Sequence, residues 1–284
     1  MPSLIGVLLI IFSAACFGAM AIFARLAYEG GASITTLLFL RFAIASVIML
    51  SWIFIRGLPL PRGRVLLTLV LMGGLGYAGQ SFCYFTALTF ASAGLVALLL
   101  YLYPAIVTVL ATTFLKEPIS KAKIAALLLA LPGTFLTIGP ERGGHSLGVV
   151  LALGAAFIYS FYILVGSRIT AQGTAVPFSA VIITSAAVVY GIALAFRGPV
   201  WPVTWTGWIW VLAIALISTV LAVVTFLAGL ERVGPTHAAT LSTVEPAVTI
   251  ALAALVLDEP LTPMRVVGGI MILLAVIVLA RTRL

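Results

Sequence analysis

The chain has 284 residues, of which 63% are hydrophobic and 8% are charged, and its formal net charge is +8. An average soluble domain is about half apolar and about a quarter charged, so this composition excludes an ordinary water-soluble protein. The basic residues stand singly or in small groups between long apolar stretches, which is typical of membrane topology signals rather than of a nucleic-acid surface. We therefore expect an integral membrane protein that lies in a lipid bilayer and has no nucleic-acid partner.

Apolar stretches long enough to cross a bilayer recur along the whole chain. A hydrocarbon core about 30 Å thick requires about 20 mostly apolar residues in a helix, and Gly- and Pro-containing turns separate the stretches. The predicted fold is an all-α, multi-pass protein of the cell's inner (plasma) membrane with ten transmembrane helices. In chain order these are 4–24, 34–55, 65–87, 93–114, 119–138, 147–167, 176–196, 207–230, 237–257 and 263–280.

The basic residues are unevenly divided between the two sides of this arrangement. With the N-terminus in the cytoplasm, ten of the 15 fall inside, four fall outside, and one lies within the second span. This bias predicts that both termini are cytoplasmic, although Arg25 alone favours the opposite orientation. The inside set is Arg56, Arg62, Arg64, Lys116, Lys121, Lys123, Arg168, Arg232, Arg281 and Arg283, the outside set is Arg25, Arg142, Arg197 and Arg265, and the residue within the span is Arg41.

The two halves of the chain resemble each other. Tyr103-Pro104-Ala105, followed by Lys116-Glu117-Pro118, lies 142 residues before Glu245-Pro246-Ala247, followed by Asp258-Glu259-Pro260, and 142 is half of 284. We therefore predict two repeats, residues 1–139 and 147–284, with five spans each. Because five crossings reverse the direction of the second copy, the repeats are expected to be inverted, which is a transporter architecture with the solute site where the halves meet.

These motifs also carry a resemblance to a known family. The duplicated Pro-x-x-x-(apolar)-Glu-Pro pattern at the ends of the fourth and ninth spans, together with Leu40-Arg41-Phe42, resembles the EamA-type drug/metabolite transporter superfamily over the entire chain. Within it, the chain is most similar to YddG-type exporters of aromatic and other amino acids. The resemblance implies export of small metabolites by alternating access. Export of drugs, nucleosides or sugars, a passive facilitator or channel, and an intramembrane enzyme are the alternatives.

Tyrosines at helical spacing are the first candidates for a solute site. Tyr77, Gln80 and Tyr84 lie at i, i+3 and i+7 in the third span, so they share one polar face that lipid would not favour. Tyr159 and Tyr162 share a face of the sixth span, and Tyr101 lies in the fourth. Together these side chains are expected to line a cavity with apolar walls and a few hydroxyls, suited to a small amphipathic solute. Packing between helices is the alternative for each.

Glu245 is the one acidic residue well inside a predicted span, with Ser242 and Thr249 on its helical face. A carboxylate at that depth costs about 2.5 to 3.5 kcal/mol on insertion scales, so it is expected to face a wet cavity or the bundle interior. It is a candidate for proton coupling or for binding a solute ammonium, together with Ser242. A carboxyl tied to a neighbouring helix is the structural alternative.

Two prolines at matching positions in the repeats, Pro104 and Pro246, interrupt the fourth and ninth spans. Each removes a backbone donor and is expected to free the carbonyl four residues earlier, that of Leu100 or Ser242. Broken helices at corresponding positions point to a transporter site, so both prolines are predicted to act as hinges beside the pathway. A static kink is the alternative.

Other features are expected to be structural or absent. Arg41 is assigned a structural role by the family resemblance, and Glu117-Pro118 suits a helix start, with an acid near the positive end of the dipole. Cys16 and Cys83 lie in apolar segments and are expected to be buried. The sequence contains no GxxxxGK[ST], HExxH or GxSxG motif, so we expect no cofactor, no metal site, no ATP coupling and no enzymatic activity.

Overall fold

The computed structural model describes residues 4–87, 90–91, 93–138, 145–169, 175–257 and 261–280. The predicted turn at 139–144 with Arg142, the Asp258-Glu259-Pro260 motif, and the basic residues Arg281 and Arg283 lie outside these ranges. Within them the chain folds into thirteen α-helices and two π-helical segments, with no β-strand. The all-α prediction is therefore confirmed for this part of the chain.

The first repeat contains seven α-helices and one π-helical segment. Helix α2 begins after Ser33, whose side chain accepts a hydrogen bond from the Thr36 N–H. It ends at Gly57, whose φ of 60° lies in the left-handed region that favours glycine. The elements are α1 (Leu4–Glu29), α2 (Ile34–Arg56), α3 (Gly63–Leu71), η1 (Met72–Tyr77), α4 (Ala78–Ala87), α5 (Ala93–Leu100), α6 (Tyr103–Leu115) and α7 (Lys121–Ile138).

The second repeat follows a similar order. Its elements are α8 (Ser146–Ile169), α9 (Ala175–Arg197), α10 (Trp205–Ala215), η2 (Leu216–Leu221), α11 (Ala222–Leu241), α12 (Val244–Val256) and α13 (Pro263–Ala280). Helix α11 turns a corner at Gly234, whose φ of 76° and ψ of 170° are not helical, and Pro235 follows. The predicted eighth and ninth spans are therefore joined by this corner instead of by a loop from 231 to 236.

In the described part of the chain, six helical segments are long and apolar enough to cross a membrane, judged by length and composition: Leu4–Glu29, Ile34–Arg56, Gly63–Ala87, Ser146–Ile169, Ala175–Arg197 and Trp205–Leu241. Tyr103–Leu115, Val244–Val256 and Pro263–Val278 are shorter apolar helices. The outer surface exposes large apolar side chains such as Phe54, Val203 and Phe196. Water does not favour such a surface, so these helices define a multi-pass membrane protein.

Two predicted spans are broken into separate helices. A turn at Tyr101–Leu102 separates α5 from α6, and a turn at Ser242–Thr243 separates α11 from α12. Pro104 and Pro246 lie in the first turn of the helix after each break, where a missing N–H costs nothing. The prediction that the Ser242 carbonyl is free is wrong, because this oxygen accepts a hydrogen bond of 3.0 Å from the Glu245 N–H. The turn therefore gives the Ser242 carbonyl a hydrogen-bond donor that a continuous kinked helix would not provide.

The π-helical segments were not predicted. One lies in the third span and one in the eighth, so the two repeats carry them at nearly corresponding positions. A π segment contains an extra residue per turn and changes which side chains face inward, and it is frequent at functional sites. Each of these segments places polar side chains next to Arg41, as described below.

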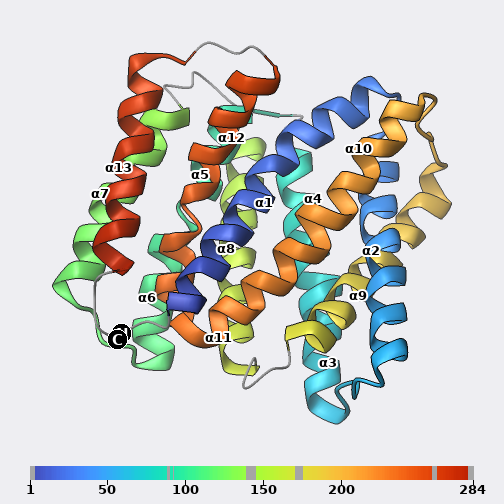
Figure 1. The fold of residues 1–284 in the computed structure, drawn as a ribbon, viewed down its shortest axis with the longest axis horizontal. Helices are drawn as coiled ribbons and strands as arrows, with labels where there is room; N and C mark the ends of the chain where they lie inside the picture. The colour runs from blue at the N-terminus through green and yellow to red at the C-terminus, as the bar shows by residue number, and fades with distance from the viewer. Residues whose placement is uncertain are drawn as a thin grey trace.

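Helices from the two repeats pack against one another throughout the bundle. In Figure 1, α1 crosses α11 and α12, α2 lies along α9, and α7 lies along α13. Gly18 allows α1 to approach closely, since a Cβ there would lie 2.7 Å from the Glu245 carbonyl oxygen of α12. The interface between the repeats is therefore the core of the molecule.

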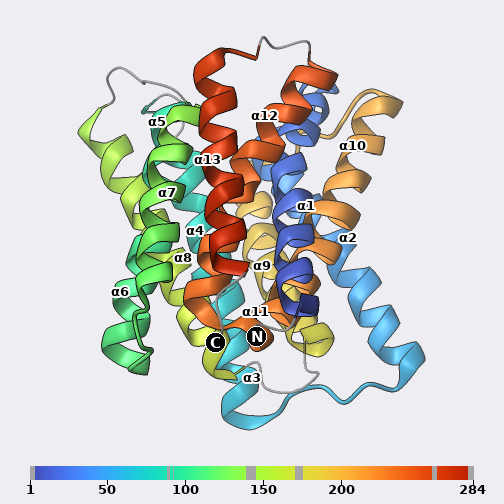
Figure 2. The ribbon, with the colours of Figure 1, turned by 60° about the vertical axis from the view of Figure 1, so that its left-hand side comes forward.

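Figure 2 shows that α1 begins and α13 ends at the same end of the bundle. We call this the termini end, and it also holds the α2–α3 and α6–α7 connections. The opposite end, here called the mouth end, holds the α1–α2 and α9–α10 connections. Backbone hydrogen bonds from Ser33 N to Val200 O (3.2 Å) and from Val203 N to Gly30 O (2.9 Å) join the two repeats there.

Candidate functional site

A cavity of about 580 Å³ lies between the two repeats. We call it the central cavity. Both repeats contribute to its walls, through α1, α2, α4, α5, α6, α7, α8, α11, α12 and α13 together with Tyr77 of η1. Eight of the ten residues that the sequence predicts as solute-binding or hinge positions line it: Tyr77, Gln80, Tyr84, Tyr101, Tyr159, Tyr162, Glu245 and Pro246.

The other two predicted positions, Ser242 and Pro104, are buried and do not line the cavity. The prediction for Ser242 assumed one continuous helix in which residues i and i+3 share a face. Because the chain turns at Ser242–Thr243, that relation does not hold across the break. It does hold within α12, where Glu245 and Thr249 both line the cavity.

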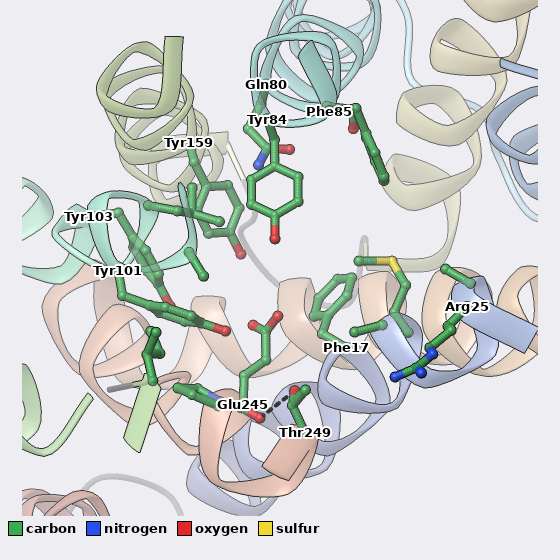
Figure 3. A pocket seen from close by; sticks show the side chains of 18 of the residues that line it. Phe17, Arg25, Gln80, Tyr84, Phe85, Tyr101, Tyr103, Tyr159, Glu245 and Thr249 are labelled. Atoms are coloured by element: carbon green, nitrogen blue, oxygen red, sulfur yellow. Dashed lines mark hydrogen bonds between the residues drawn. The ribbon is translucent and has the colours of Figure 1, made fainter. Parts of the chain in front are cut away.

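Glu245 projects from the first turn of α12 into the cavity, and Figure 3 shows the hydroxyl groups of Tyr84, Tyr101 and Tyr159 turned towards its carboxylate. The N-terminal end of a helix carries a partial positive charge, which favours an acid in this position. Thr249 Oγ1 donates to the Glu245 carbonyl at 3.0 Å and lies 2.9 Å from the Gly18 carbonyl. The backbone that carries the carboxylate is therefore fixed against α1.

A continuous series of aromatic rings forms one wall of the cavity. Ring centroids are 6.0 Å apart between Tyr77 and Tyr162, 6.0 Å between Tyr162 and Tyr159, and 4.8 Å between Tyr159 and Tyr103. Phe226 of α11 extends the series, 6.4 Å from Tyr159. Such a wall offers apolar ring faces with hydroxyls at their edges, and it suits an apolar or aromatic group on a solute that also carries polar groups.

Sequence reasoning missed Tyr103, Phe226 and Arg41 as members of the cavity. Tyr103 belongs to the repeat motif itself, and its hydroxyl donates to the Ala239 carbonyl of the second repeat at 3.3 Å. A tyrosine beside a helix-breaking proline was a usable signal for it. Phe226 lies in an apolar run whose side chains look alike in sequence, so no such signal existed there.

Arg41 is 2% exposed, although it lies within an apolar helix. Its Nε donates to Thr219 Oγ1 at 2.7 Å, and its Nη2 donates to the Tyr77 hydroxyl and to the Ser218 carbonyl at 3.4 Å. The guanidinium also lies over the Phe42 ring, 4.8 Å from its centroid. These contacts join α2 to both π-helical segments, and Arg41 also lines the cavity.

The cavity extends to the mouth end of the bundle. Arg25 and Glu29 at the end of α1, and Arg265 at the start of α13, belong to its lining. Arg25 Nε and Glu29 Oε1 form an exposed ion pair at 3.7 Å. The entrance is therefore polar and charged, whereas the interior is aromatic.

The described cavity lining does not reach the termini end, where Glu117 links the first repeat to the second. Glu117 Oε1 pairs with Lys123 Nζ at 2.7 Å, and Thr236 Oγ1 of the second repeat donates to Glu117 Oε2 at 2.9 Å. The Lys123 side chain is 9% exposed and that of Glu117 is 18% exposed. Glu117 thus does more than begin a helix, since α7 starts only at Lys121 and the carboxylate bridges α7 and α11.

The cavity lies between the two repeats and reaches the mouth end. The sequence profile of the EamA-like transporter family matches residues 4–139 and again residues 146–281. The chain belongs to this family. The predicted resemblance to the EamA-type superfamily is confirmed.

Individual relatives share less than 30% sequence identity with the chain. The chain is 26% identical over 282 residues to an uncharacterized transporter, YcbK, of Bacillus subtilis, covering 93% of this chain and 88% of that protein. It is 28% identical over 163 residues to the aromatic amino acid exporter YddG of Ancylobacter novellus, covering 55% and 56%. A solved structure, described only as the crystal structure of a protein, shares the fold with a TM-score of 0.84 at 22% identity and 96% coverage of both chains.

Proposed function

We propose that the protein exports small amphipathic metabolites, above all amino acids with aromatic or other hydrophobic side chains, across the cell's inner membrane by alternating access. The observation that carries this proposal is the position of Glu245, a carboxylate surrounded by tyrosines in a cavity between the repeats. An ammonium group is attracted to such a carboxylate, and the ring faces accommodate an apolar side chain. The relationship to an aromatic amino acid exporter supports the same solute class.

The proposed topology has ten spans and cytoplasmic termini. Each break or π-helical segment lies within one proposed crossing, and the corner at Gly234 divides α11 between two crossings. The fifteen helical elements then group into ten proposed crossings, and an even number agrees with both termini lying at one end. The basic residues support cytoplasmic termini. Arg56, Arg62, Arg64, Lys116, Lys121, Lys123, Arg168 and Arg232 lie in or next to connections at the termini end, against Arg25, Arg197 and Arg265 at the mouth end.

Cysteine labelling tests this orientation. In a variant without Cys16 and Cys83, a membrane-impermeant reagent added outside cells is expected to label a cysteine at position 197 and not one at position 121. The physical reason is that Arg197 and Lys121 lie at opposite ends of the bundle. The reverse pattern contradicts the proposed orientation and, with it, the direction of export.

Glu245 has two proposed roles that a transport measurement separates. If the carboxylate exchanges a proton with solution, flux of phenylalanine in liposomes depends on a pH gradient and Glu245→Gln loses that dependence. If it binds the solute ammonium, Glu245→Gln instead lowers solute affinity at every pH, by about tenfold for the loss of about 1.4 kcal/mol from one charge-assisted hydrogen bond. Glu231→Gln is the matched control, because Glu231 pairs with Arg232 outside the cavity.

The same liposomes test alternating access and solute class. Unlabelled phenylalanine on the far side is expected to accelerate exchange of labelled phenylalanine, since a carrier returns faster when loaded. Flux without this acceleration indicates a passive facilitator or channel. Saturable flux of nucleosides, sugars or cationic drugs, with none for amino acids, assigns the protein to another branch of the superfamily.

A further inference from the structure

The proposed function leaves one charged group in the cavity unexplained. Arg41 lies in the membrane-spanning part of α2, and all the partners of its guanidinium are neutral: two hydroxyls, a backbone carbonyl and the Phe42 and Tyr77 rings. A cation within a bilayer is expensive, and it commonly pairs with an acid or marks a solute pathway. A purely structural role accounts for these contacts but not for the choice of a charged side chain.

No acid in the described part of the chain forms an ion pair with Arg41. Glu29 pairs with Arg25, Glu117 with Lys123, and Glu231 with Arg232. The remaining described acid, Glu245, lines the same cavity as Arg41. Arg41 and Glu245 are therefore a cation and an anion that line one cavity with no salt bridge between them among the described residues.

The free hydrogen-bonding capacity of the cation is available to a solute. The contacts of Arg41 use Nε and Nη2, and they leave Nη1 with no hydrogen-bond partner among the described residues. The Tyr77 hydroxyl accepts from Nη2, so its own proton is free to donate into the cavity that Tyr77 also lines. Arg41 Nη1 and the Tyr77 hydroxyl are thus two neighbouring donors, a combination suited to a carboxylate.

We propose that Arg41 and Glu245 are opposite-charge subsites that select zwitterionic solutes, with the solute carboxylate at Arg41 and Tyr77 and its ammonium at Glu245. This inference rests on the proposed function and assigns Arg41 as a specificity-determining residue. A bound zwitterion compensates both buried charges at once. An amine without a carboxylate leaves Arg41 uncompensated, and an acid without an amine leaves Glu245 uncompensated, so both bind more weakly.

Three solutes that differ in one group each test the assignment: phenylalanine, phenethylamine, which lacks the carboxylate, and 3-phenylpropionate, which lacks the ammonium. Purified wild-type protein in detergent is expected to bind phenylalanine at least tenfold more tightly than either analogue, measured by displacement of labelled phenylalanine. Flux of the same solutes in liposomes is measured in parallel. Selective binding without flux supports the subsites and contradicts the transport proposal. Flux without selectivity supports the transport proposal and contradicts the subsites.

The variants separate a solute contact from a structural role. Arg41→Gln is expected to weaken the binding of phenylalanine at least tenfold and the binding of phenethylamine less than twofold. Glu245→Gln is expected to weaken the binding of both solutes. An equal loss for phenylalanine and phenethylamine in Arg41→Gln overturns the proposal, because a structural residue has no preference among solutes. If Arg41→Gln does not fold, Tyr77→Phe decides, since it removes one carboxylate donor and keeps the ring: a loss confined to phenylalanine supports the proposal, and an equal or absent loss overturns it.

Discussion

The two ends of the bundle are built from equivalent pieces of sequence and yet differ. Lys123, six residues after Glu117, forms a partly buried ion pair with it at the termini end. Its counterpart 142 residues later, Arg265, six residues after Glu259, lines the cavity at the mouth end. The same six-residue spacing of acid and base occurs in both copies. The environment of the basic residue therefore depends on the conformation of the protein and not on this spacing.

In the proposed mechanism the repeats exchange environments, so that the contacts around Glu117, Lys123 and Thr236 open when the mouth end closes. Single substitutions in these contacts are then expected to change how stable the closed arrangement of the termini end is. Substitutions at the termini end, at the contact between α1 and α12, and at the mouth end are expected to have effects of different size.

Charge reversal at the closed end is expected to have the largest effect. Glu117→Lys places two cations where an ion pair of 2.7 Å now lies. Because this pair is only partly buried, we expect a cost below the about 3 to 5 kcal/mol of breaking a fully buried pair. The closed state is therefore expected to open at the termini end. In a variant without Cys16 and Cys83, a cysteine at the cavity position Thr249 is expected to react at least tenfold faster with reagent applied from that end.

The double variant Glu117→Lys with Lys123→Glu is the control, because it restores opposite charges in nearly the same positions. We expect it to recover at least half of the lost protection. If the double variant is as reactive as the single one, the ion pair does not hold this end closed, and the hydrogen bond from Thr236 to Glu117 is the remaining candidate.

An intermediate effect is expected midway between the ends, where α1 crosses α12. Gly18→Ala places a Cβ 2.7 Å from the Glu245 carbonyl oxygen, which must move. Overpacking of this kind costs about 1 to 3 kcal/mol, so thermal unfolding in detergent is expected at a lower temperature, together with weaker solute binding at Glu245. Gly154→Ala is the matched control, since a Cβ there meets nothing within 4 Å and improves helix propensity by up to about 1 kcal/mol. Equal destabilisation by both changes would contradict the close approach at Gly18.

Truncation of the two equivalent basic residues compares the ends directly. Lys123→Ala leaves Glu117 with its Thr236 hydrogen bond but without its cation, so reactivity of the cysteine at position 249 from the termini end is expected to rise by about threefold to tenfold, for about 0.7 to 1.4 kcal/mol. Arg265→Ala acts at the mouth end and is expected to change that reactivity less than twofold. A similar rise in both variants would show that the basic residues act through overall charge and not through their positions.

The smallest effect is expected at the entrance. Arg25 and Glu29 form an ion pair 3.7 Å apart, and their side chains are 56% and 61% exposed. Exposed pairs contribute about 0 to 1 kcal/mol and are screened by salt. Glu29→Gln is therefore expected to change the unfolding temperature by less than about 2 °C and the flux of phenylalanine by less than twofold. A larger loss would indicate that Glu29 contacts the solute as it enters.

The sequence alone determined the membrane environment, the helical class and the duplication, because apolar length and a 142-residue offset need no tertiary information. It also determined the tyrosine face of the third span and the acid in the ninth: Tyr77, Gln80 and Tyr84 share a helix face at fixed spacing, and all three line the cavity with Glu245. These signals were available because polar groups stand out against an apolar background.

Only the tertiary structure decided the direction in which the remaining groups face. Lipid-facing and core-facing side chains are both apolar in a membrane, so the pattern of hydrophobicity does not distinguish Phe226 in the cavity from Phe196 on the surface. The turn at Ser242–Thr243 separates Ser242 from the face of Glu245, and the two π-helical segments bring Tyr77, Ser218 and Thr219 to Arg41. These are contacts between segments up to 178 residues apart, and they form because buried polar groups require partners that local sequence does not supply.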